Sequence, residues 1–409
     1  MSEIKVNSVK GVGASTAAIT INNTDGTCDA NLTTISGSQL THRNMMINGA
    51  MEVSQKLSYE TGRAKTTNAG AGDFYGIDMF KLRNNTGNLK QTQSTDTPDG
   101  FYYALRVDVE SSGTPTANHY NTIQGSIEGS DIIRTCFGET GAKTLTLSWY
   151  VKSNLTGTFT GGIINEDNNR SYAFDYTISS ANTWERKTIT FAGDTTGTWH
   201  KDNQLGMRIV FALAVGSTYL TSTATTWQAA EHMGTTNGQN VLASTDNYWA
   251  VTGVQLEVGS VATAFEHKPF GDEFRRCCRY YQKSRQYGQP NQEAPQTWNT
   301  PEASLNSSKR NQFYDTLQHW VNGTMRVNPT MRFFGSGSGN NDGTINQHRF
   351  EIPGVRNDQI SRTPDTLTAN RDGFFCRFQL ASGTPDDGTY RSGSGNAFVR
   401  MTYDANSEM

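Results

Sequence analysis

Residues 248–284 read YWAVTGVQLEVGSVATAFEHKPFGDEFRRCCRYYQKS, and this stretch says more about the fold than any other. Two sets of small or apolar residues alternate along its first third: Trp249, Val251 and Gly253 on one side, and mostly Ala250, Val254, Leu256 and Val258 on the other. Such alternation predicts a strand that is buried on both faces. The pattern slips by one residue near Gly253, which predicts a β-bulge there.

A short helix is expected directly after this strand. Pro269 and Gly271 end the extended run, and Asp272 and Glu273 suit the positive end of a helix dipole. Residues at helical spacing then form one apolar stripe: Phe270, Phe274, Cys277, Cys278 and Tyr281. Arginines cover the opposite side: Arg275, Arg276 and Arg279. A final strand followed by a capped helix indicates a junction between two domains.

The region before this stretch has the pattern of a β-sandwich. Alternate inward residues predict one clear strand: Leu145, Leu147, Trp149 and Val151. Residues 188–191 and 207–213 show the same pattern, and turn clusters lie at 84–87, 165–169 and 193–197. Many short strands at this spacing are typical of a jelly-roll-type sandwich. Its two antiparallel sheets are expected to bury Trp149, Phe211 and Trp249 between them.

Composition supports an all-β protein of more than one domain. The chain has 409 residues, too many for one ordinary core. Hydrophobic residues make up only 34% and charged residues only 18%, yet aromatic residues reach 10% and there are 40 glycines. A disordered chain would show the reverse, with few aromatic residues and many charges. Short strands joined by many turns are therefore expected.

Four stretches resemble segments of bacteriophage tail fibre and receptor-binding proteins. They are RNMMINGAMEVSQ (43–55), FYGIDMFKL (74–82), FAGDTTGTWHKDNQLGMRIVFALAVGS (191–217) and VQLEVGSVATAFEHKPFGDEFRRCCRYYQKS (254–284). The first resembles the opening strand of a carbohydrate-binding-module-like sandwich, and the third resembles its penultimate strands. The fourth resembles the segment of these proteins in which such a sandwich ends and a C-terminal tip begins. The resemblance implies a virion protein that docks on the phage tail, through an adaptor, nozzle or baseplate protein, and attaches to the host.

On this basis the chain divides into four parts. They are an N-terminal tail-attachment arm (1–43), a carbohydrate-binding-module-like β-sandwich (44–268), a junction helix (269–284) and a C-terminal β receptor-binding tip (285–409). The arm shows only short strand patterns, at 5–9 and 18–21, with a turn at 22–26. Because a lone hairpin is marginally stable, the arm is either a floppy leader or borrows a core from its own copies or another protein. With the resemblance, this favours a homotrimer.

Charge and cysteine usage exclude several classes of partner. The net charge is −3, without a Lys/Arg cluster that could follow a phosphate backbone, so no nucleic acid is expected. No membrane insertion is expected either, because no stretch approaches the ~20 apolar residues of a membrane helix. An early Glu3 and many Ser/Thr residues argue against a signal peptide and for folding in the host cytoplasm. The five scattered cysteines are expected to be free, with Cys277 and Cys278 packed as small hydrophobes.

The sequence shows no recognisable catalytic set. The motifs HExxH, CxxC, G-x-S-x-G, the P-loop and the Rossmann fingerprint are all absent, so no enzyme, cofactor or metal is expected. Two carboxylate pairs, 166–167 and 386–387, could serve a glycosidase, but both lie in Gly/Asn-rich turns, where Asp is favoured for backbone reasons. A structural calcium at Asp194, Asp202 and Asn203 lacks a full ligand loop.

Binding to a host surface polysaccharide remains as the expected function. Aromatic rings pack on the C–H faces of sugars, and amides, carboxylates and arginines bond to their hydroxyls. Long Gly-rich loops of the tip, at 335–343 and 381–396, would present such groups. The candidates are Tyr287, Trp298, Trp320, Phe333, Phe334, Asn340, Asn341, Asp342, Asp386, Asp387, Tyr390 and Arg391. The alternatives are a tail-associated glycan-degrading or deacetylating enzyme, and a purely structural tail spacer.

Overall fold

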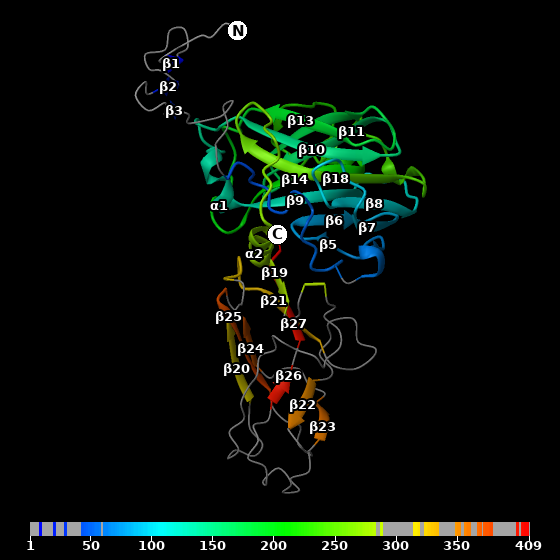
Figure 1. Cartoon of the computed structure of the whole chain (residues 1–409). Helices are drawn as coiled ribbons and strands as arrows, with labels where there is room; N and C mark the ends of the chain where they lie inside the picture. Colours follow the sequence, from blue (N-terminus) through cyan, green and yellow to red (C-terminus); the bar gives the residue numbers. More distant parts are fainter. Residues whose placement is uncertain are drawn as a thin grey trace, which may run out of the picture.

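A large β-sandwich, a smaller C-terminal β region and an N-terminal three-stranded sheet make up the protein (Figure 1). The computed structural model describes residues 8–9, 19–21, 28–30, 42–58, 60–283, 287–288, 314–319, 323–334, 348–352, 356–360, 366–369, 371–378, 398–400 and 402–408. The expectation of an all-β sandwich is confirmed. Among the described residues, no helix is both long and apolar enough to cross a membrane.

The sandwich has one six-stranded and one seven-stranded sheet. The first has the order β13 (Glu185–Phe191), β10 (Leu145–Ser153), β18 (Tyr248–Val258), β8 (Ala104–Ser111), β7 (Asn88–Ser94) and β4 (Ala64–Thr67). The second has the order β16 (Trp227–Gln228), β12 (Ser171–Ile178), β11 (Gly157–Ile164), β14 (Leu205–Val215), β9 (Tyr120–Glu128), β6 (Phe80–Asn84) and β5 (Phe74–Ile77). Neighbouring strands in both sheets pair antiparallel where their register is defined.

Short elements connect the sandwich strands. These are η1 (Thr61–Arg63), α1 (Gly129–Ile132), η2 (Ile133–Thr135), η3 (Ser217–Tyr219), η4 (Val241–Ala243) and the parallel pair β15 (Leu220–Thr221) and β17 (Gly234–Thr235). The segment 231–234 lies on the outside of the seven-stranded sheet. A Cβ atom at Gly162 on β11 would come within 2.7 Å of the carbonyl oxygen of His232, so the glycine permits this close approach.

Aromatic side chains fill the space between the two sheets, as predicted. Trp149, Phe211 and Trp249 are fully buried. The Phe211 ring centroid lies 5.6 Å from that of Trp149 and 5.3 Å from that of Trp249. The buried Trp249 Nε1 donates a hydrogen bond of 3.0 Å to the Tyr176 hydroxyl, so the indole is satisfied inside the core. Burial of each large side chain contributes roughly 1.5–3 kcal/mol.

Strand β18 has the predicted double burial and the predicted bulge. Ten of its eleven residues are buried, with only Val258 partly exposed. The pairing with β10 shifts register between Ser148 and Tyr150, opposite Gly253, whose φ is +62°. That left-handed backbone favours glycine, and a Cβ atom there would lie 2.7 Å from the Phe101 ring. The bulge therefore requires glycine at this position.

Residues 43–55 do not form the opening strand that the resemblance implied. They are buried but irregular, with positive φ at Asn48 and Met51. Side-chain hydrogen bonds from Asn48 take the place of main-chain pairing between strands. Its Nδ2 donates to the carbonyl oxygens of Val53 and Asp78, both at 2.8 Å. The segment still joins β18, since the Met45 N–H donates to the Leu256 carbonyl oxygen at 2.9 Å.

The junction helix is shorter than the predicted 269–284 segment. Helix α2 (Phe270–Cys278) begins after Pro269, as expected, but the chain then enters strand β19 (Tyr281–Lys283). Tyr281 therefore lies on a strand and not on the helical stripe, because β19 pairs with β27 (Thr402–Asn406). Cys277 and Cys278 are buried free thiols, which confirms that prediction.

The arm and the tip contribute further small sheets. In the arm, β1 (Ser8–Val9), β2 (Ile19–Ile21) and β3 (Cys28–Ala30) pair antiparallel in that order. The tip contains β20 (Tyr314–His319), β21 (Thr330–Phe334), β22 (His348–Ile352), β23 (Arg356–Ile360), β24 (Thr366–Ala369), β25 (Gly373–Phe378) and β26 (Phe398–Arg400). Together with β19 and β27 they form three-stranded sheets in the orders β19-β27-β21, β20-β25-β24 and β23-β22-β26.

Candidate functional site

Most of the predicted glycan contacts lie outside the described residues. These are Trp298, Trp320, Asn340, Asn341, Asp342, Asp386, Asp387, Tyr390 and Arg391. Phe333 and Phe334 lie on β21, where they pair with Tyr403 and Thr402 of β27. Their role in glycan binding stays a prediction.

Tyr287 lies at the junction between the sandwich and the tip. Its ring packs edge-on against Phe274, with centroids 5.7 Å apart, and against Phe270 at 5.4 Å. Its hydroxyl accepts a 2.9 Å hydrogen bond from the Ser54 N–H and donates to the Glu52 carbonyl oxygen at 3.2 Å. Through these contacts, Tyr287 packs against the sandwich and against helix α2.

The strongest candidate site among the described residues is the outer face of the seven-stranded sheet. Strand register places Lys81 of β6 opposite Gln124 of β9, and Gln124 opposite Val210 of β14. The alternate residues on the same strands belong to the core, so these side chains point outward. We call the following set the polar face: Asp73, Lys81, Arg83, Gln124, Glu166, Arg208, Glu231 and His232.

Several buried polar atoms on this face have no hydrogen-bond partner in the described part of the chain. They are Gln124 Oε1, Glu166 Oε2, Arg208 Nε and His232 Nδ1. Gln124 is fully buried and Arg208 is only 5% exposed. A buried polar atom is normally paired, because leaving it unpaired costs about 1–3 kcal/mol. Acceptors and a donor thus gather on one face without hydrogen-bond partners among the described residues.

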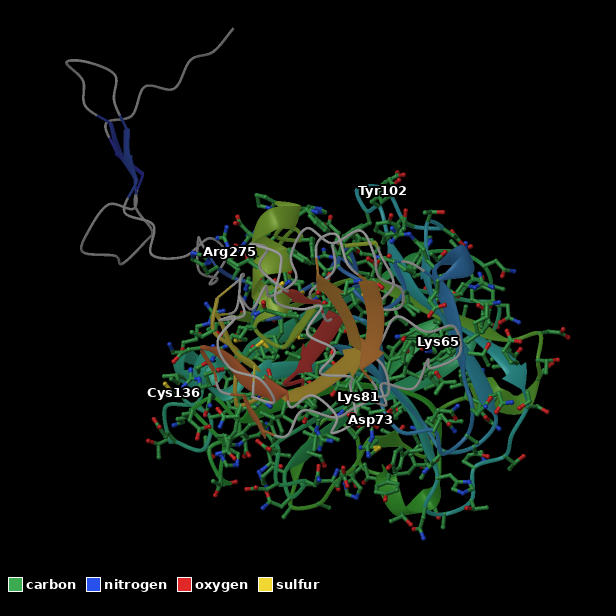
Figure 2. The ribbon with its side chains drawn as sticks, turned by 90° about the horizontal axis from the view of Figure 1, so that it is seen from below. Lys65, Asp73, Lys81, Tyr102, Cys136 and Arg275 are labelled. Atoms are coloured by element: carbon green, nitrogen blue, oxygen red, sulfur yellow. The ribbon has the colours of Figure 1, made fainter. Side chains whose placement is uncertain are left out.

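The charged members of the face form two groups. Asp73 accepts from both cations of β6, with Oδ2 at 3.2 Å from Lys81 Nζ and Oδ1 at 3.2 Å from Arg83 Nε. Figure 2 shows Asp73 and Lys81 next to each other. Arg208 NH2 lies 3.6 Å from a carboxylate oxygen of Glu231. These pairs hold the side chains in fixed positions on the sheet.

Burial shifts the titration of this group toward the uncharged forms. It lowers the pKa of Lys81, of Arg208 and of His232, and it raises the pKa of Glu231. In each case loss of water around the charged form is the largest cause. Clusters of shifted pKa values are found at functional sites more often than elsewhere.

Three tyrosines lie beside the polar face. The Arg83 guanidinium donates to the Tyr120 hydroxyl at 2.7 Å, and its central carbon lies 4.4 Å from the centre of that ring. Tyr219 packs edge-on against Tyr120, with ring centroids 5.3 Å apart. On the other side, the Lys81 ammonium lies 5.6 Å from the ring centre of Tyr75. Tyr120 and Tyr219 keep part of their surface exposed.

The tip joins the sandwich near the Glu166 side of this face. Arg326 NH1 donates to the Asn203 carbonyl oxygen at 2.7 Å, and Asn203 Nδ2 donates back to the Arg326 carbonyl oxygen at 3.0 Å. Arg326 also donates to the Ser407 carbonyl oxygen at 2.9 Å. Burial lowers the pKa of Arg326, and Tyr280, Glu128 and Glu166 partly oppose that shift, in this order.

The described carboxylates do not assemble a cation site. Asp194 accepts from Arg170 Nε at 2.7 Å and from Trp199 Nε1 at 3.1 Å, and is therefore occupied as an ion pair. Asn203 is used in the tip contact. Within the described parts of the chain, no group of three or more His, Cys, Asp or Glu side chains could hold a metal ion. In the 166–167 turn, Asp167 lies 3.6 Å from His200.

One feature of the sequence points to this face, although the apolar alternation that predicted the strands does not include it. Arg208 stands inside MRIVFALAV, and Lys81 inside DMFKL, so each interrupts an otherwise apolar strand. A charge within a strand that is buried on both faces must be paired or functional. The alignment of these strands, however, comes from the register and not from the spacing in the sequence.

No protein-family model matches the sequence, and no curated protein matches it. Similar solved structures include a CBM4 module with 15% identity and a TM-score of 0.27, where the match covers 52% of this chain and 99% of the module. A Family 11 carbohydrate-binding module from Clostridium thermocellum, in complex with a β-1,3-1,4-mixed-linked tetrasaccharide, has 13% identity, a TM-score of 0.25 and coverage of 49% and 98%. The enzymatically active domain of bacteriophage CBA120 tailspike protein 4 has 10% identity and a TM-score of 0.25, with coverage of 53% of this chain and 21% of that chain. At these identities and TM-scores the likeness carries no argument about what this chain binds or does.

Proposed function

We propose that the protein recognises a glycan through the polar face and does not degrade it. The observation that carries the proposal is the group of unpaired buried atoms on one sheet face, with donor and acceptor types mixed. A sugar hydroxyl both donates and accepts, so a ring of hydroxyls suits such a mixed set. The nearby Tyr120 and Tyr219 offer aromatic surface for the C–H groups of a sugar.

The wider role we propose is that of a phage tail fibre that attaches the virion to a host surface polysaccharide. The sequence stretches that resemble tail fibre proteins support this role. In it, the arm docks on a tail protein and three chains assemble, which raises the avidity of weak single sites through effective concentration. Light scattering on the full-length protein tests the assembly, with a trimer expected and a monomer contradicting it.

Binding to susceptible cells or their extracted polysaccharide tests the site. Gln124→Met keeps a similar volume but removes the unpaired Oε1 acceptor together with the 3.0 Å hydrogen bond from Nε2 to the Thr122 hydroxyl, so folding is checked by circular dichroism, and affinity should fall about 3- to 10-fold. Gln204→Met is the matched control, because the Gln204 side chain is exposed and, among the described residues, bonds to the nearby Asp202 and His200, while the main-chain bond from the Gly129 N–H to its carbonyl oxygen is kept. Equal affinity of both variants and the parent would contradict the proposed site.

A chain-length assay separates binding from degradation. Incubation of the polysaccharide with the full-length protein should leave its chain length unchanged. Shortened chains would favour the enzyme alternative, with the carboxylate pairs 166–167 and 386–387 as the first positions to change. If the protein bound no cells at all but was found on particles, the spacer alternative would be favoured.

A further inference from the structure

A separate charged cleft lies where the N-terminal arm meets the sandwich. Its volume is about 440 Å³, within the ~300–1,000 Å³ that is typical of small-ligand sites. Residues from three separate parts of the chain line it, among them Met45, Asp131, Ile133, Arg134, Lys268 and Arg276. None of these residues belongs to the polar face. We call this site the arm-root cleft.

The lining of the cleft is predominantly cationic. Arg134, Lys268 and Arg276 face a single acidic side chain, Asp131. Burial raises the pKa of Asp131, with Arg276 and Arg134 opposing that shift. Burial also lowers the pKa of Lys268, where the positive charge of Arg276 acts in the same direction. The positive charges in the cleft therefore repel each other. Burial also disfavours the charged form of Asp131, the carboxylate in the lining.

Two glutamates near Lys268 do not add negative charge to the lining of the cleft. Glu266 and Glu273 lie 3.6 and 3.8 Å from the Lys268 ammonium, so they partly balance its charge. Each glutamate also accepts from a backbone amide, Glu266 from the Asn44 N–H at 2.9 Å and Glu273 Oε2 from the Asn48 N–H, while Glu273 Oε1 pairs with Arg276 and Lys268. Both glutamates line a smaller neighbouring cavity and not the arm-root cleft.

Arg276 keeps donors for a ligand. Its NH1 bonds to Glu273 at 3.3 Å, which leaves one guanidinium edge without a hydrogen bond to the described residues. A guanidinium edge matches the two oxygens of a carboxylate. The apolar side of the cleft is supplied by Met45 and by Ile133, which is 50% exposed. One wall is thus suited to an anion and the other to C–H groups.

From this combination we propose that the arm-root cleft binds a sugar residue that carries a carboxylate, such as a hexuronate. The carboxylate bonds to the open edge of the Arg276 guanidinium, and the ring packs beside Ile133. Arg134, whose NH1 and NH2 donate to the carbonyl oxygens of His42 and Arg43, and Lys268 contribute positive charge to the cleft. This site is independent of the polar face, so the chain has two glycan contacts on different parts of the sandwich. An acidic host polysaccharide would bind to both the polar face and the arm-root cleft.

The test is titration calorimetry of the full-length protein with four sugars. Glucuronate and galacturonate should bind, and glucose and galactose should bind at least 10-fold more weakly. Raising the salt concentration from ~0.05 to ~0.5 M should weaken the acidic sugars, because screening acts on the charge contact. Inorganic phosphate is run as a simple anion. Phosphate binding as tight as that of the hexuronates would overturn the sugar assignment.

Two variants and one control locate the site. Arg276→Gln should weaken glucuronate binding about 10-fold, and Ile133→Asp, at an exposed position, should do the same through charge repulsion without loss of folding. Arg275→Gln is the control, since the Arg275 side chain is 73% exposed and its one ion pair with the described residues is to Asp272, 3.8 Å away. Unchanged affinity in the two test variants, or an equal loss in the control, would overturn the proposal. Gln124→Met tests the polar face and should leave glucuronate binding at this cleft intact.

Discussion

Removal of Arg279 is expected to destabilise the connection between sandwich and tip. Its guanidinium donates two hydrogen bonds to the Glu128 carboxylate, of 2.8 and 2.6 Å, and Tyr280 donates a third of 2.8 Å. Glu128 is only 1% exposed. Arg279→Met would leave this carboxylate buried without its cation.

The expected loss of unfolding free energy follows from how deeply Glu128 and Arg279 are buried. Breaking a buried ion pair from one side typically costs about 3–5 kcal/mol. Because the Arg279 side chain keeps 31% of its surface exposed, water can replace part of the lost contact. We therefore expect about 3 kcal/mol, which is more than a hundredfold in the unfolding equilibrium. In urea, with a slope of about 1–3 kcal/mol/M, the midpoint should fall by roughly 1 M or more.

The pH dependence gives an independent check on the same pair. Burial alone would raise the pKa of Glu128, but the hydrogen bonds from Arg279 and Tyr280 outweigh it and hold the pKa below its usual value of 4.5. A depressed pKa stabilises the fold above the unfolded-state value, and that stabilisation is lost as the pH falls through the folded-state pKa. The difference between parent and Arg279→Met should therefore be full at pH 7 and shrink below about pH 4.5.

Urea unfolding at pH 7, followed by tryptophan fluorescence and circular dichroism, measures the effect. Arg275→Met is the control, since it removes an exposed arginine from helix α2, directly before Arg279, and should change stability by less than about 0.5 kcal/mol. A midpoint for Arg279→Met within error of that control would refute the reasoning. A difference that does not shrink at low pH would show that Glu128 is not the group involved.

Further predictions concern the bulge and the thiols. Gly253→Ala should destabilise the protein by about 1–3 kcal/mol in urea unfolding, because its φ of +62° disfavours a side chain and the new Cβ would lie 2.7 Å from Phe101. Gly271→Ala, with no atom within 4 Å of its new Cβ atom, should be neutral or slightly stabilising, and equal losses in the two variants would contradict the role of the bulge. Burial raises the pKa of the Cys277 thiol well above its usual value, so in native protein a maleimide should label the partly exposed Cys136 before Cys277. Peptide mapping after labelling checks this, and early modification of Cys277 would mean that the junction opens readily.

Local patterns in the sequence predicted the core of the sandwich. The double burial of β18 and the bulge at Gly253 both follow from apolar alternation and one glycine. The burial of Trp149 follows in the same way from the alternation of apolar residues along β10. Prediction was weaker where side chains replaced backbone pairing. Residues 43–55 carry apolar residues like a strand, but the amide of Asn48 bonds to the main chain and the backbone turns.

The polar face could not be predicted because it depends on register. Lys81, Gln124 and Arg208 come from three strands whose alignment is set by the paired sheet and not by the sequence spacing. The end of helix α2 was missed for a similar reason. Tyr281 continues the apolar spacing of the helix, yet its backbone pairs with Asn406 near the other end of the chain. Local periodicity carries no information about that distant partner.

Hydrogen exchange followed by mass spectrometry tests the central claim most directly. The full-length protein would be compared with and without the extracted polysaccharide of a susceptible host. Binding at the polar face predicts slower exchange in peptides from β9, β14 and the 231–235 segment, and unchanged exchange in the outer strand β4 of the opposite sheet. Protection confined to peptides from 285–409 would place the glycan on the tip and contradict the claim that the sandwich face binds it.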